Sequence, residues 1–379
     1  EWCSSRRPGS GTAKAAVAMG ALLSVFEPVP NPDRQTGEQR REGRLNTKIL
    51  TLKPPSSVLP PDSEMEDHVD IETGLVGLGP ASCREQCFWM TVVPKDFSRV
   101  DKVMVFIHGY SDSAGGMFQN NMLAMAHLHG VACIAFDVRG HGRSDGLHLM
   151  IESWEGLVGW CTDFLDAFVP RQLRDWSDRL GGKKLSLFAL GESMGGGLLT
   201  HICLQRPDYF KGVILVCPML EIAADLRPDP VTLFIVKRIL LPLIPTWAVS
   251  PETKSLDEVL MRDKELAKRL HDDNEYGSGD SKMRLATAYQ LGMVACDYLQ
   301  AHLADFSTPF LIFHGGADLV TDPAFSQRMY DTAASADKTI EMVEGAWHSE
   351  VFEGREPEQI LKAYQCAADW LDARTWCYR

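Results

Sequence analysis

Disulfide bonding is not expected to shape this chain, because cysteine is sparse: its 379 residues include ten cysteines. Cys133 and Cys217 lie in apolar runs, where a thiol behaves as a small hydrophobic side chain. Cys83 and Cys87 stand four residues apart, but no second pair with zinc-ligand spacing accompanies them. We therefore expect a reducing compartment, and neither a metal site nor another cofactor.

Positive charge is also in short supply, since 38 basic residues face 51 acidic ones and the formal net charge is −13. Binding to a phosphate backbone requires the opposite sign, so nucleic acid is not an expected partner. Hydrophobic residues at 45% and charged residues at 23% are typical of a folded globular protein. This composition argues against a wholly disordered chain and against a multi-span membrane protein.

No long hydrophobic run is free of charge. The most apolar stretch, residues 231–249, has Lys237 and Arg238 at its centre and is interrupted by Pro242 and Pro245. Each central charge costs ~2.5–3.5 kcal/mol on membrane-insertion scales, so a transmembrane span is not expected. We favour an amphipathic cap helix over a binding cleft, and the alternative is a helix buried in the core.

Residues 1–67 contain little that would form a core. They are rich in Pro, Arg, Gly and Ser, as at residues 53–57, and this composition predicts a flexible leader. Residues 19–24 fit the Met-Gly-x-x-x-Ser/Thr pattern for N-myristoylation, which matters only if synthesis begins at Met19. An organelle-targeting peptide and plain disorder are the other interpretations. The leader therefore leaves the location open between the cytoplasm, a peripheral membrane position and an organelle.

Short apolar segments alternate with helical patterns through the rest of the chain. This alternation predicts a mostly parallel sheet with helices on both faces. We assign this α/β core to residues 68–218 and 306–379, and an inserted helical cap or lid, which has no strand signal, to residues 219–305. Helical spacing of apolar residues marks 151–179 and a C-terminal segment that begins near Pro357. The predicted strands are 87–93, 103–107, 131–136, 184–190, 213–217, 309–313 and 338–343.

The sharpest local motif is at residues 191–195, which read Gly-Glu-Ser-Met-Gly between an apolar strand and a helical run. A strand-to-helix turn this tight forces its central residue into a strained backbone conformation, which neighbours without side chains tolerate. That geometry raises the Ser193 hydroxyl above the sheet at a helix N-terminus, where negative charge is favoured. The alternative is a glycine-rich turn that has no catalytic role.

A serine hydroxyl becomes a strong nucleophile only when a base removes its proton and a carboxylate orients that base. In this architecture the partners follow in the order Ser, acid, His, at the ends of later strands. Asp318 follows the predicted strand 309–313, and His348 follows the strand 338–343. We therefore predict Ser193 as nucleophile, Asp318 as acid and His348 as base. His314 is expected to pack structurally, and Asp322 to cap a helix.

An oxyanion hole requires two backbone N–H groups that point at one position. Met194, the residue after the nucleophile, is expected to supply one of them. The strand 103–107 leads into Gly109 and Tyr110, and we assign the second N–H to Tyr110, with a plain strand-end turn as the alternative. The glycine-rich segment 137–146 also follows a strand, but it lacks the ending of a phosphate loop and a dinucleotide fingerprint. We interpret it as a scaffold loop that borders the site.

Together these segments resemble the monoacylglycerol lipase and lysophospholipase branch of the α/β-hydrolases. The resemblance covers residues 66–371 and implies the same triad and the same two oxyanion-hole N–H groups. Plant-type members, which include caffeoylshikimate esterase, are more similar than the animal lipases, which carry His where this chain has Glu192. The segments that carry the resemblance are 108–110, 137–146, 191–196, 218–219, 314–323 and 347–348.

We therefore predict a serine carboxylic-ester hydrolase that acts through an acyl-enzyme on monoacylglycerol or lysophospholipid-like esters. The alternatives are a hydroxycinnamoyl esterase of the caffeoylshikimate type, acyl transfer to an acceptor other than water, and a non-catalytic ligand receptor on the same fold. The expected partner is a small, lipid-like ester. Part of the apolar surface of 231–249 is predicted to line an acyl or aromatic pocket, with Phe234 and Leu240 as substrate-binding candidates, and part to meet lipid aggregates or a partner.

Overall fold

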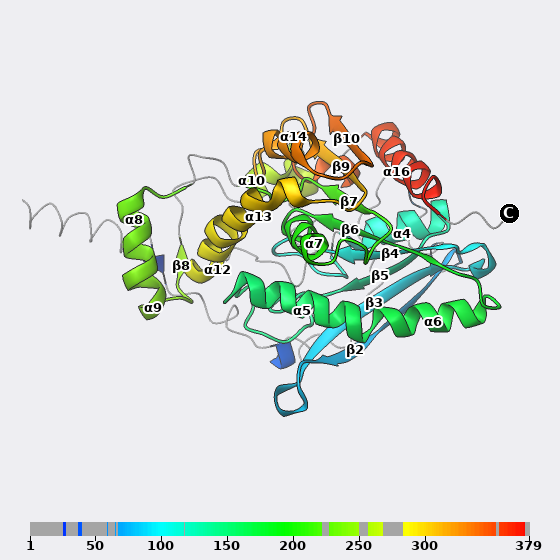
Figure 1. Cartoon of the computed structure of the whole chain (residues 1–379), viewed down its shortest axis with the longest axis horizontal. Helices are drawn as coiled ribbons and strands as arrows, with labels where there is room; N and C mark the ends of the chain where they lie inside the picture. The colour runs from blue at the N-terminus through cyan, green and yellow to red at the C-terminus, as the bar shows by residue number, and fades with distance from the viewer. Residues whose placement is uncertain are drawn as a thin grey trace, which may run out of the picture.

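The computed structural model describes residues 26–27, 37–39, 59, 65, 67–116, 118–221, 227–249, 257–267, 283–353 and 356–375. Most of the predicted leader, including the pattern at residues 19–24, lies outside these ranges. The described part of the chain contains an eight-stranded sheet, several helices packed against it, and a helical insertion that extends from one end (Figure 1).

The sheet is largely parallel, as predicted. Its strand order is β10-β9-β7-β6-β4-β5-β3-β2, with β3 and β2 antiparallel to their neighbours at one edge. The edge strand β2 is absent from the strands expected from sequence. It is partly exposed, and Asp70, Glu72 and Gly74 interrupt its run of apolar residues. The strands are β2 (Val69–Leu78), β3 (Glu85–Pro94), β4 (Lys102–Ile107), β5 (Ala132–Phe136), β6 (Ser186–Glu192), β7 (Val213–Val216), β9 (Phe310–Gly315) and β10 (Lys338–Val343).

Helices cover both faces of the sheet, which confirms the predicted fold class (Figure 1). Successive side chains of β4 enter different cores: Val103 and Val105 pack with the cluster on one face, and Met104 and Phe106 with the cluster on the other. The first face carries α5 (Trp154–Ala167), α6 (Val169–Arg179) and α7 (Met194–Gln205), and the second carries α4 (Phe118–His129) and α16 (Pro357–Asp372).

The helix predicted over 151–179 is interrupted in the structure. It divides at Phe168 into α5 and α6, because Pro170 lies in the first turn of α6 and has no N–H to continue the ladder of α5. Ser153 caps α5 by accepting a hydrogen bond from the Gly156 N–H. The C-terminal helix begins at Pro357, the position favoured by the sequence.

The described part of the insertion is mainly helical. One difference from the sequence expectation is β8, two residues that pair antiparallel with β1 (Phe26–Glu27) from the leader region. Within the described residues, none of the helices combines the length and the apolar character needed to span a bilayer. The elements are α8 (Pro230–Ile235), a π-helical turn (Val236–Leu240), α9 (Leu241–Leu243), β8 (Ala248–Val249), α10 (Asp257–Leu260), α12 (Leu285–Tyr289), a second π-helical turn (Gln290–Ala295) and α13 (Cys296–His302).

Candidate active site

Ser193 lies in the turn between β6 and α7, near the middle of the sheet. Its φ of 52° and ψ of −118° lie in a region that non-glycine residues rarely adopt. The surrounding backbone holds it there: the Ser193 N–H donates to the Val216 carbonyl at 3.0 Å, and its own carbonyl accepts from Met219 N–H at 2.8 Å. The strain predicted for the central residue of this motif is therefore present.

The glycines around Ser193 are required by close packing of backbone. A Cβ added at Gly195 would lie 1.9 Å from the carbonyl oxygen of Ile107, and one at Gly191 would lie 2.4 Å from that of Gly195. At Gly196 a Cβ would meet Pro218 at 2.7 Å. The motif therefore lets α7 start against the ends of β4 and β7, so that Ser193 comes close to the loops that follow those strands.

Asp318 and His348 meet at the carboxyl ends of the parallel strands, in the loops after β9 and β10. His348 Nδ1 lies 2.7 Å from Asp318 Oδ2, and both side chains are buried. The other carboxylate oxygen, Oδ1, accepts the N–H groups of Val320 at 2.7 Å and Thr321 at 3.1 Å. The carboxylate thus has a fixed orientation, and it leaves Nε2 as the ring nitrogen available to another group.

The electrostatics of this pair favour a charged carboxylate beside a basic imidazole. Burial alone would raise the pKa of Asp318, but the charge of His348 and hydrogen bonds from His314, His348 and Val320 outweigh burial and hold that pKa well below its usual range. Burial alone would lower the pKa of His348, but Asp318 and then Glu192 outweigh it and raise that pKa. His348 is therefore a stronger base than an isolated histidine.

His314 contacts Asp318 as well as packing in the core. Its side chain is fully buried, with Nε2 3.3 Å from Asp318 Oδ2 and 3.1 Å from the carbonyl oxygen of Thr321. Its Nδ1 lies 2.7 Å from the hydroxyl oxygen of Ser326. The expected helix cap is confirmed, because Asp322 accepts a hydrogen bond from the N–H of Ala324 at the start of α14 (Pro323–Thr332).

The two residues predicted for the oxyanion hole lie near Ser193 in the chain or in the fold. Met194 is the first residue of α7 and is buried. Tyr110 follows β4 in a turn that approaches Ser193, since a Cβ at Gly109 would lie 3.4 Å from Ser193 Cβ. In the same turn Ser111 adopts a φ of 67°. This arrangement is compatible with the oxyanion-hole assignment, which stays a prediction.

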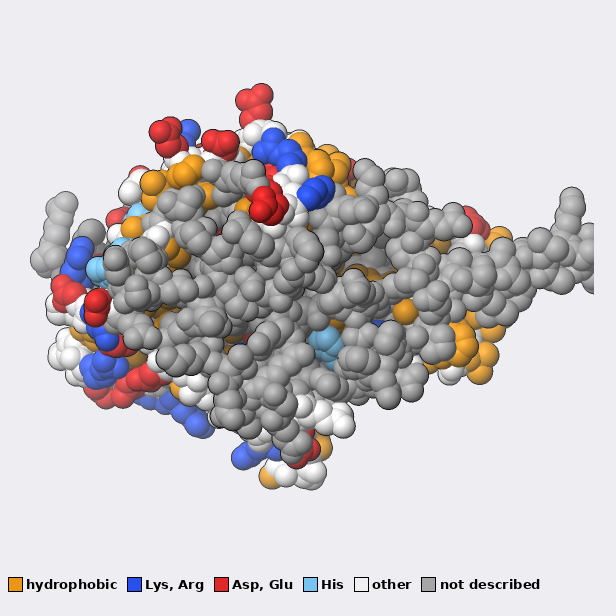
Figure 2. Space-filling view, turned by 180° about the vertical axis from the view of Figure 1, so that it is seen from behind, with side chains coloured by type: hydrophobic (Ala, Val, Ile, Leu, Met, Phe, Trp, Pro, Cys, Tyr) orange, Lys and Arg blue, Asp and Glu red, His pale blue; other side chains and the backbone are white. Residues whose placement is uncertain are grey.

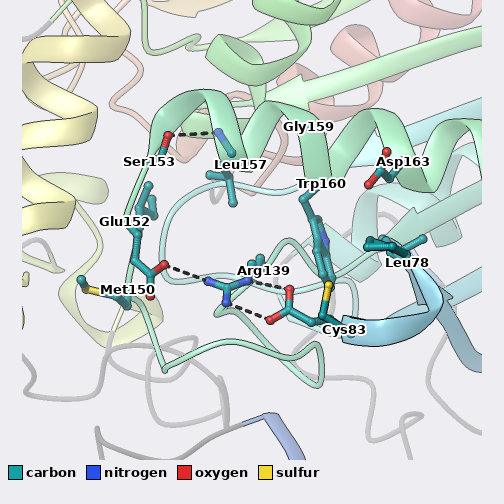
Figure 3. Close-up of a pocket in the computed structure, with 15 residues that line it drawn as sticks. Leu78, Cys83, Arg139, Met150, Glu152, Ser153, Leu157, Gly159, Trp160 and Asp163 are labelled. Carbon is teal, nitrogen blue, oxygen red and sulfur yellow. Dashed lines mark hydrogen bonds and ion pairs between the residues drawn. The ribbon is translucent and has the colours of Figure 1, made fainter.

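The segment 137–146 is built as a scaffold. The buried Asp137 carboxylate accepts the N–H groups of Ala114 and Arg143, each at 2.7 Å. Arg139 forms a bidentate pair with Glu85 at 2.8 Å and lies 3.7 Å from Glu152, on the wall of a pocket of about 360 Å³ (Figure 3). Both carboxylates pair with this guanidinium, so the segment is tied to β3 and to the loop before α5. The pocket is lined by none of the three predicted triad residues.

Glu192 is a component of the site that the sequence motif did not reveal. It occupies the variable position of the motif, where no residue type signals a role. Desolvation raises its pKa to about 7; His348 opposes that shift, whereas Asp112 and Asp318 add to it. Glu192 therefore titrates in the same range as a histidine, and it contributes to the raised pKa of His348.

The sequence predicts a core thiol at Cys217, and in the structure this thiol also lies close to Asp318 and His348. It is fully buried with a φ of 41° at the end of β7. Ligand atoms of Cys217, Asp318 and His348 lie within 4.8 Å of one another, which is close enough to hold a metal ion. Burial raises the pKa of the Cys217 thiol well above its usual range, which makes it a poor metal ligand. The other two candidate metal ligands, Asp318 and His348, are already hydrogen-bonded to each other.

The two cap residues predicted to bind substrate occupy different surroundings. Leu240 is 4% exposed and packs with Leu285 in a small cluster within the insertion. Phe234 is 62% exposed on α8. The structure therefore gives Leu240 a packing contact inside the cap and leaves Phe234 at the surface, and their role in substrate binding stays a prediction.

Comparison with known proteins identifies relatives over most of the chain. The family model described as serine aminopeptidase, S33, matches residues 98–355. Caffeoylshikimate esterase of Arabidopsis thaliana is 29% identical over 292 residues, which cover 77% of this chain and 83% of that protein. Monoglyceride lipase of Homo sapiens is 25% identical over 284 residues, which cover 72% and 84%.

Solved structures support the fold. A soluble variant of monoglyceride lipase from Saccharomyces cerevisiae, in complex with a substrate analogue, superimposes with a TM-score of 0.64 at 21% identity and covers 86% of this chain and all of that one. A monoacylglycerol lipase from Paleococcus ferrophilus gives a TM-score of 0.57 at 20% identity, with coverage of 81% and 100%. At these identities the likeness supports the α/β-hydrolase fold alone.

Proposed function

The chain belongs to the serine aminopeptidase S33 family of α/β-hydrolases, and from this membership we propose that it hydrolyses carboxylic esters with Ser193, Asp318 and His348 as its catalytic triad. One observation carries the proposal: the 2.7 Å hydrogen bond between Asp318 and His348 forms at the carboxyl ends of the parallel strands, where Ser193 also lies in its strained turn. Family membership makes the chain a hydrolase; the residues and the substrate are what we propose.

The reaction proceeds in two halves. Ser193 Oγ attacks the ester carbonyl while His348 Nε2 accepts the hydroxyl proton, and Asp318 keeps the imidazole in the tautomer with Nδ1–H. The backbone N–H groups of Met194 and Tyr110 stabilise the oxyanion, and loss of one such donor costs ~2.7–4 kcal/mol. His348 returns the proton to the leaving alcohol, which leaves an acyl-enzyme. Water then repeats the sequence and releases the acid.

We propose monoacylglycerol or lysophospholipid-like esters as the substrate class. Support comes from the human relative named monoglyceride lipase and from the apolar character of the insertion. A hydroxycinnamoyl ester is the second candidate, and the relative named caffeoylshikimate esterase, with the higher identity of 29%, favours it. Both candidates share the acyl-enzyme chemistry and differ in the shape and polarity of the acid that the site accepts.

We also propose that the cap makes peripheral contact with membranes or lipid aggregates, which would bring the enzyme to a lipid-like substrate. Hydrophobic side chains gather at the end of the molecule that carries α8 and α9 (Figure 2). Val231, Phe234 and Leu243 are each more than 60% exposed, and Lys237 and Arg238 are exposed beside them. Apolar surface combined with basic residues favours anionic lipid surfaces.

A fluorophosphonate probe tests the proposed nucleophile. We expect it to label the wild-type protein at Ser193, and Ser193→Ala to lose both labelling and ester turnover while its thermal unfolding is unchanged. Labelling that persists in Ser193→Ala would refute the assignment. A panel of monoacylglycerol, lysophospholipid and hydroxycinnamoyl esters then distinguishes the two substrate classes by their kcat/KM values.

A further inference from the structure

The loop that carries His348 is closed by a buried carboxylate. Glu350 is the first residue of α15 (Glu350–Glu353), two residues after His348, and its side chain is 8% exposed. Its Oε2 accepts the backbone N–H of Trp347 at 2.9 Å, and its own N–H donates to the Trp347 carbonyl at 3.1 Å. The residues on both sides of His348 are thus tied to each other through Glu350.

The remaining partner of Glu350 comes from the insertion. The backbone N–H of Arg262 donates to Oε1 at 2.7 Å, and its guanidinium Nε donates to Oε2 at 2.9 Å. The N–H of Ser349 donates to the carbonyl of Leu260 at 3.0 Å, where α10 ends. The segment around α10 therefore lies on the core beside the His348 loop, whereas α8 and α9 extend away from it (Figure 1).

A third contact reinforces the same junction. The ammonium group of Lys264 lies 4.9 Å from the centre of a ring of Trp347, within the range of a cation–π interaction. Residues 260–264 of the insertion thus contact Trp347, Ser349 and Glu350, which immediately precede or follow His348.

Arg262 and Glu350 differ in exposure, so an effect on folding stability can be distinguished from an effect on the position of His348. The Arg262 side chain is 57% exposed, and an ion pair with a partner so exposed contributes little to folding. The Glu350 carboxylate is buried and fixes the turn around His348, and a displacement of a catalytic group by about 1 Å can cost 10²-fold in rate. Loss of Arg262 is therefore expected to affect catalysis more than stability.

We propose that Glu350 is a positioning residue for His348, and that Arg262 couples the position of this base to the seating of the cap segment 257–267 on the core. The inference rests on the proposed function, since it requires His348 to act as the base. Contact of this segment with the core aligns His348 Nε2 for proton transfer from Ser193. Loss of that contact therefore lowers kcat and leaves KM unchanged.

The test compares Arg262→Ala, Arg262→Lys, Glu350→Gln and the double variant Arg262→Ala/Glu350→Gln. Arg206→Ala is the control for loss of an ion pair away from this loop, because Arg206 forms a bidentate pair with Asp166 in which both side chains are partly exposed. Each protein is assayed for kcat and KM with a short, water-soluble ester, for the rate of fluorophosphonate labelling, and for its thermal midpoint.

We expect Arg262→Ala and Glu350→Gln each to lower kcat and the labelling rate about tenfold, with KM unchanged. The thermal midpoint should be unchanged in Arg262→Ala and lower in Glu350→Gln, because an amide NH₂ in place of one carboxylate oxygen leaves a backbone N–H without its acceptor. Arg262→Lys should recover part of the loss, because lysine restores one charged donor. The double variant should be no slower than Glu350→Gln, since Arg262 acts through Glu350. The control should remain within twofold of wild type.

Four results would overturn the inference, the last of them together with the proposed function. Full kcat and labelling rate in Arg262→Ala would show that the Arg262 side chain does not couple the segment to the base. A loss of kcat that matches the fraction of unfolded protein would show that the role is structural. A double variant about a hundredfold slower than wild type would show that Arg262 and Glu350 act independently. A wild-type protein without Ser193 labelling overturns the proposed function itself, and this inference with it.

Discussion

Replacement of Asp318 by Asn tests the triad through the tautomer of His348. The structure determines which way the new amide lies, because the N–H groups of Val320 and Thr321 both donate to Oδ1. The amide oxygen must take that position, which leaves the NH₂ group facing His348 Nδ1. The flipped orientation would set the NH₂ against two donors, and each buried N–H left without an acceptor costs about 1–3 kcal/mol.

The expected loss of kcat follows from this orientation of the amide. An NH₂ group donates to Nδ1 only when Nδ1 carries no proton, so the neutral ring holds its proton on Nε2. In that tautomer His348 cannot accept the proton of Ser193. The wrong tautomer costs serine hydrolases about 10⁴-fold in kcat, or about 5.5 kcal/mol of transition-state stabilisation.

The assay is steady-state hydrolysis of a soluble ester, with thermal unfolding to establish that Asp318→Asn is folded. Asp322→Asn is the control, because Asp322 caps α14 four residues further on and an Asn side chain accepts the same N–H. We expect the control to keep wild-type kcat. A loss smaller than tenfold in folded Asp318→Asn would refute the reasoning, because His348 would then not depend on this acceptor.

Three further changes give separable results. Glu192→Gln removes a negative charge that raises the pKa of His348, so the acid limb of the kcat/KM profile should move to lower pH by roughly half a unit to one unit; an unmoved limb would contradict this. Gly195→Ala should lower the free energy of unfolding, measured by urea titration, by about 3 kcal/mol or more, because the added Cβ would lie 1.9 Å from a backbone oxygen. Gly159→Ala in α5 is the control and should be neutral or stabilising, because nothing lies within 4 Å of the added Cβ. Phe234→Ser should weaken sedimentation with anionic vesicles and leave turnover of a soluble ester unchanged, and equal binding would refute membrane contact through α8.

The sheet was predictable because its central strands are buried on both faces. Residues of β4, β5 and β7 form continuous apolar runs, which leave a clear signal in the sequence. The order of Ser193, Asp318 and His348 after β6, β9 and β10 was visible for the same reason, since the strands fix where the loops begin. The edge strand β2 gave a weak signal, because one of its sides faces solvent and carries Asp70 and Glu72.

The electrostatic details of the site could not be predicted, because they depend on contacts between distant segments. The pKa of Glu192 is set by burial and by charges that arrive from the loops after β4, β9 and β10. Arg262 and Glu350 are 88 residues apart, and neither belongs to a recognisable motif. Such contacts arise only when the insertion docks on the core, which leaves no periodic pattern in the sequence.

The cap illustrates a third kind of limit, in which the pattern was seen but its partner was not. The excess of apolar residues over 231–249 correctly indicated more hydrophobic surface than one helix face buries. Periodicity places residues on faces, but it does not say what covers each face. Leu285, from a later part of the insertion, covers Leu240, whereas Phe234 stays 62% exposed. The two residues that sequence grouped as substrate contacts thus face different environments, so a change at Leu240 tests the packing of the cap and a change at Phe234 tests what the cap meets outside the protein.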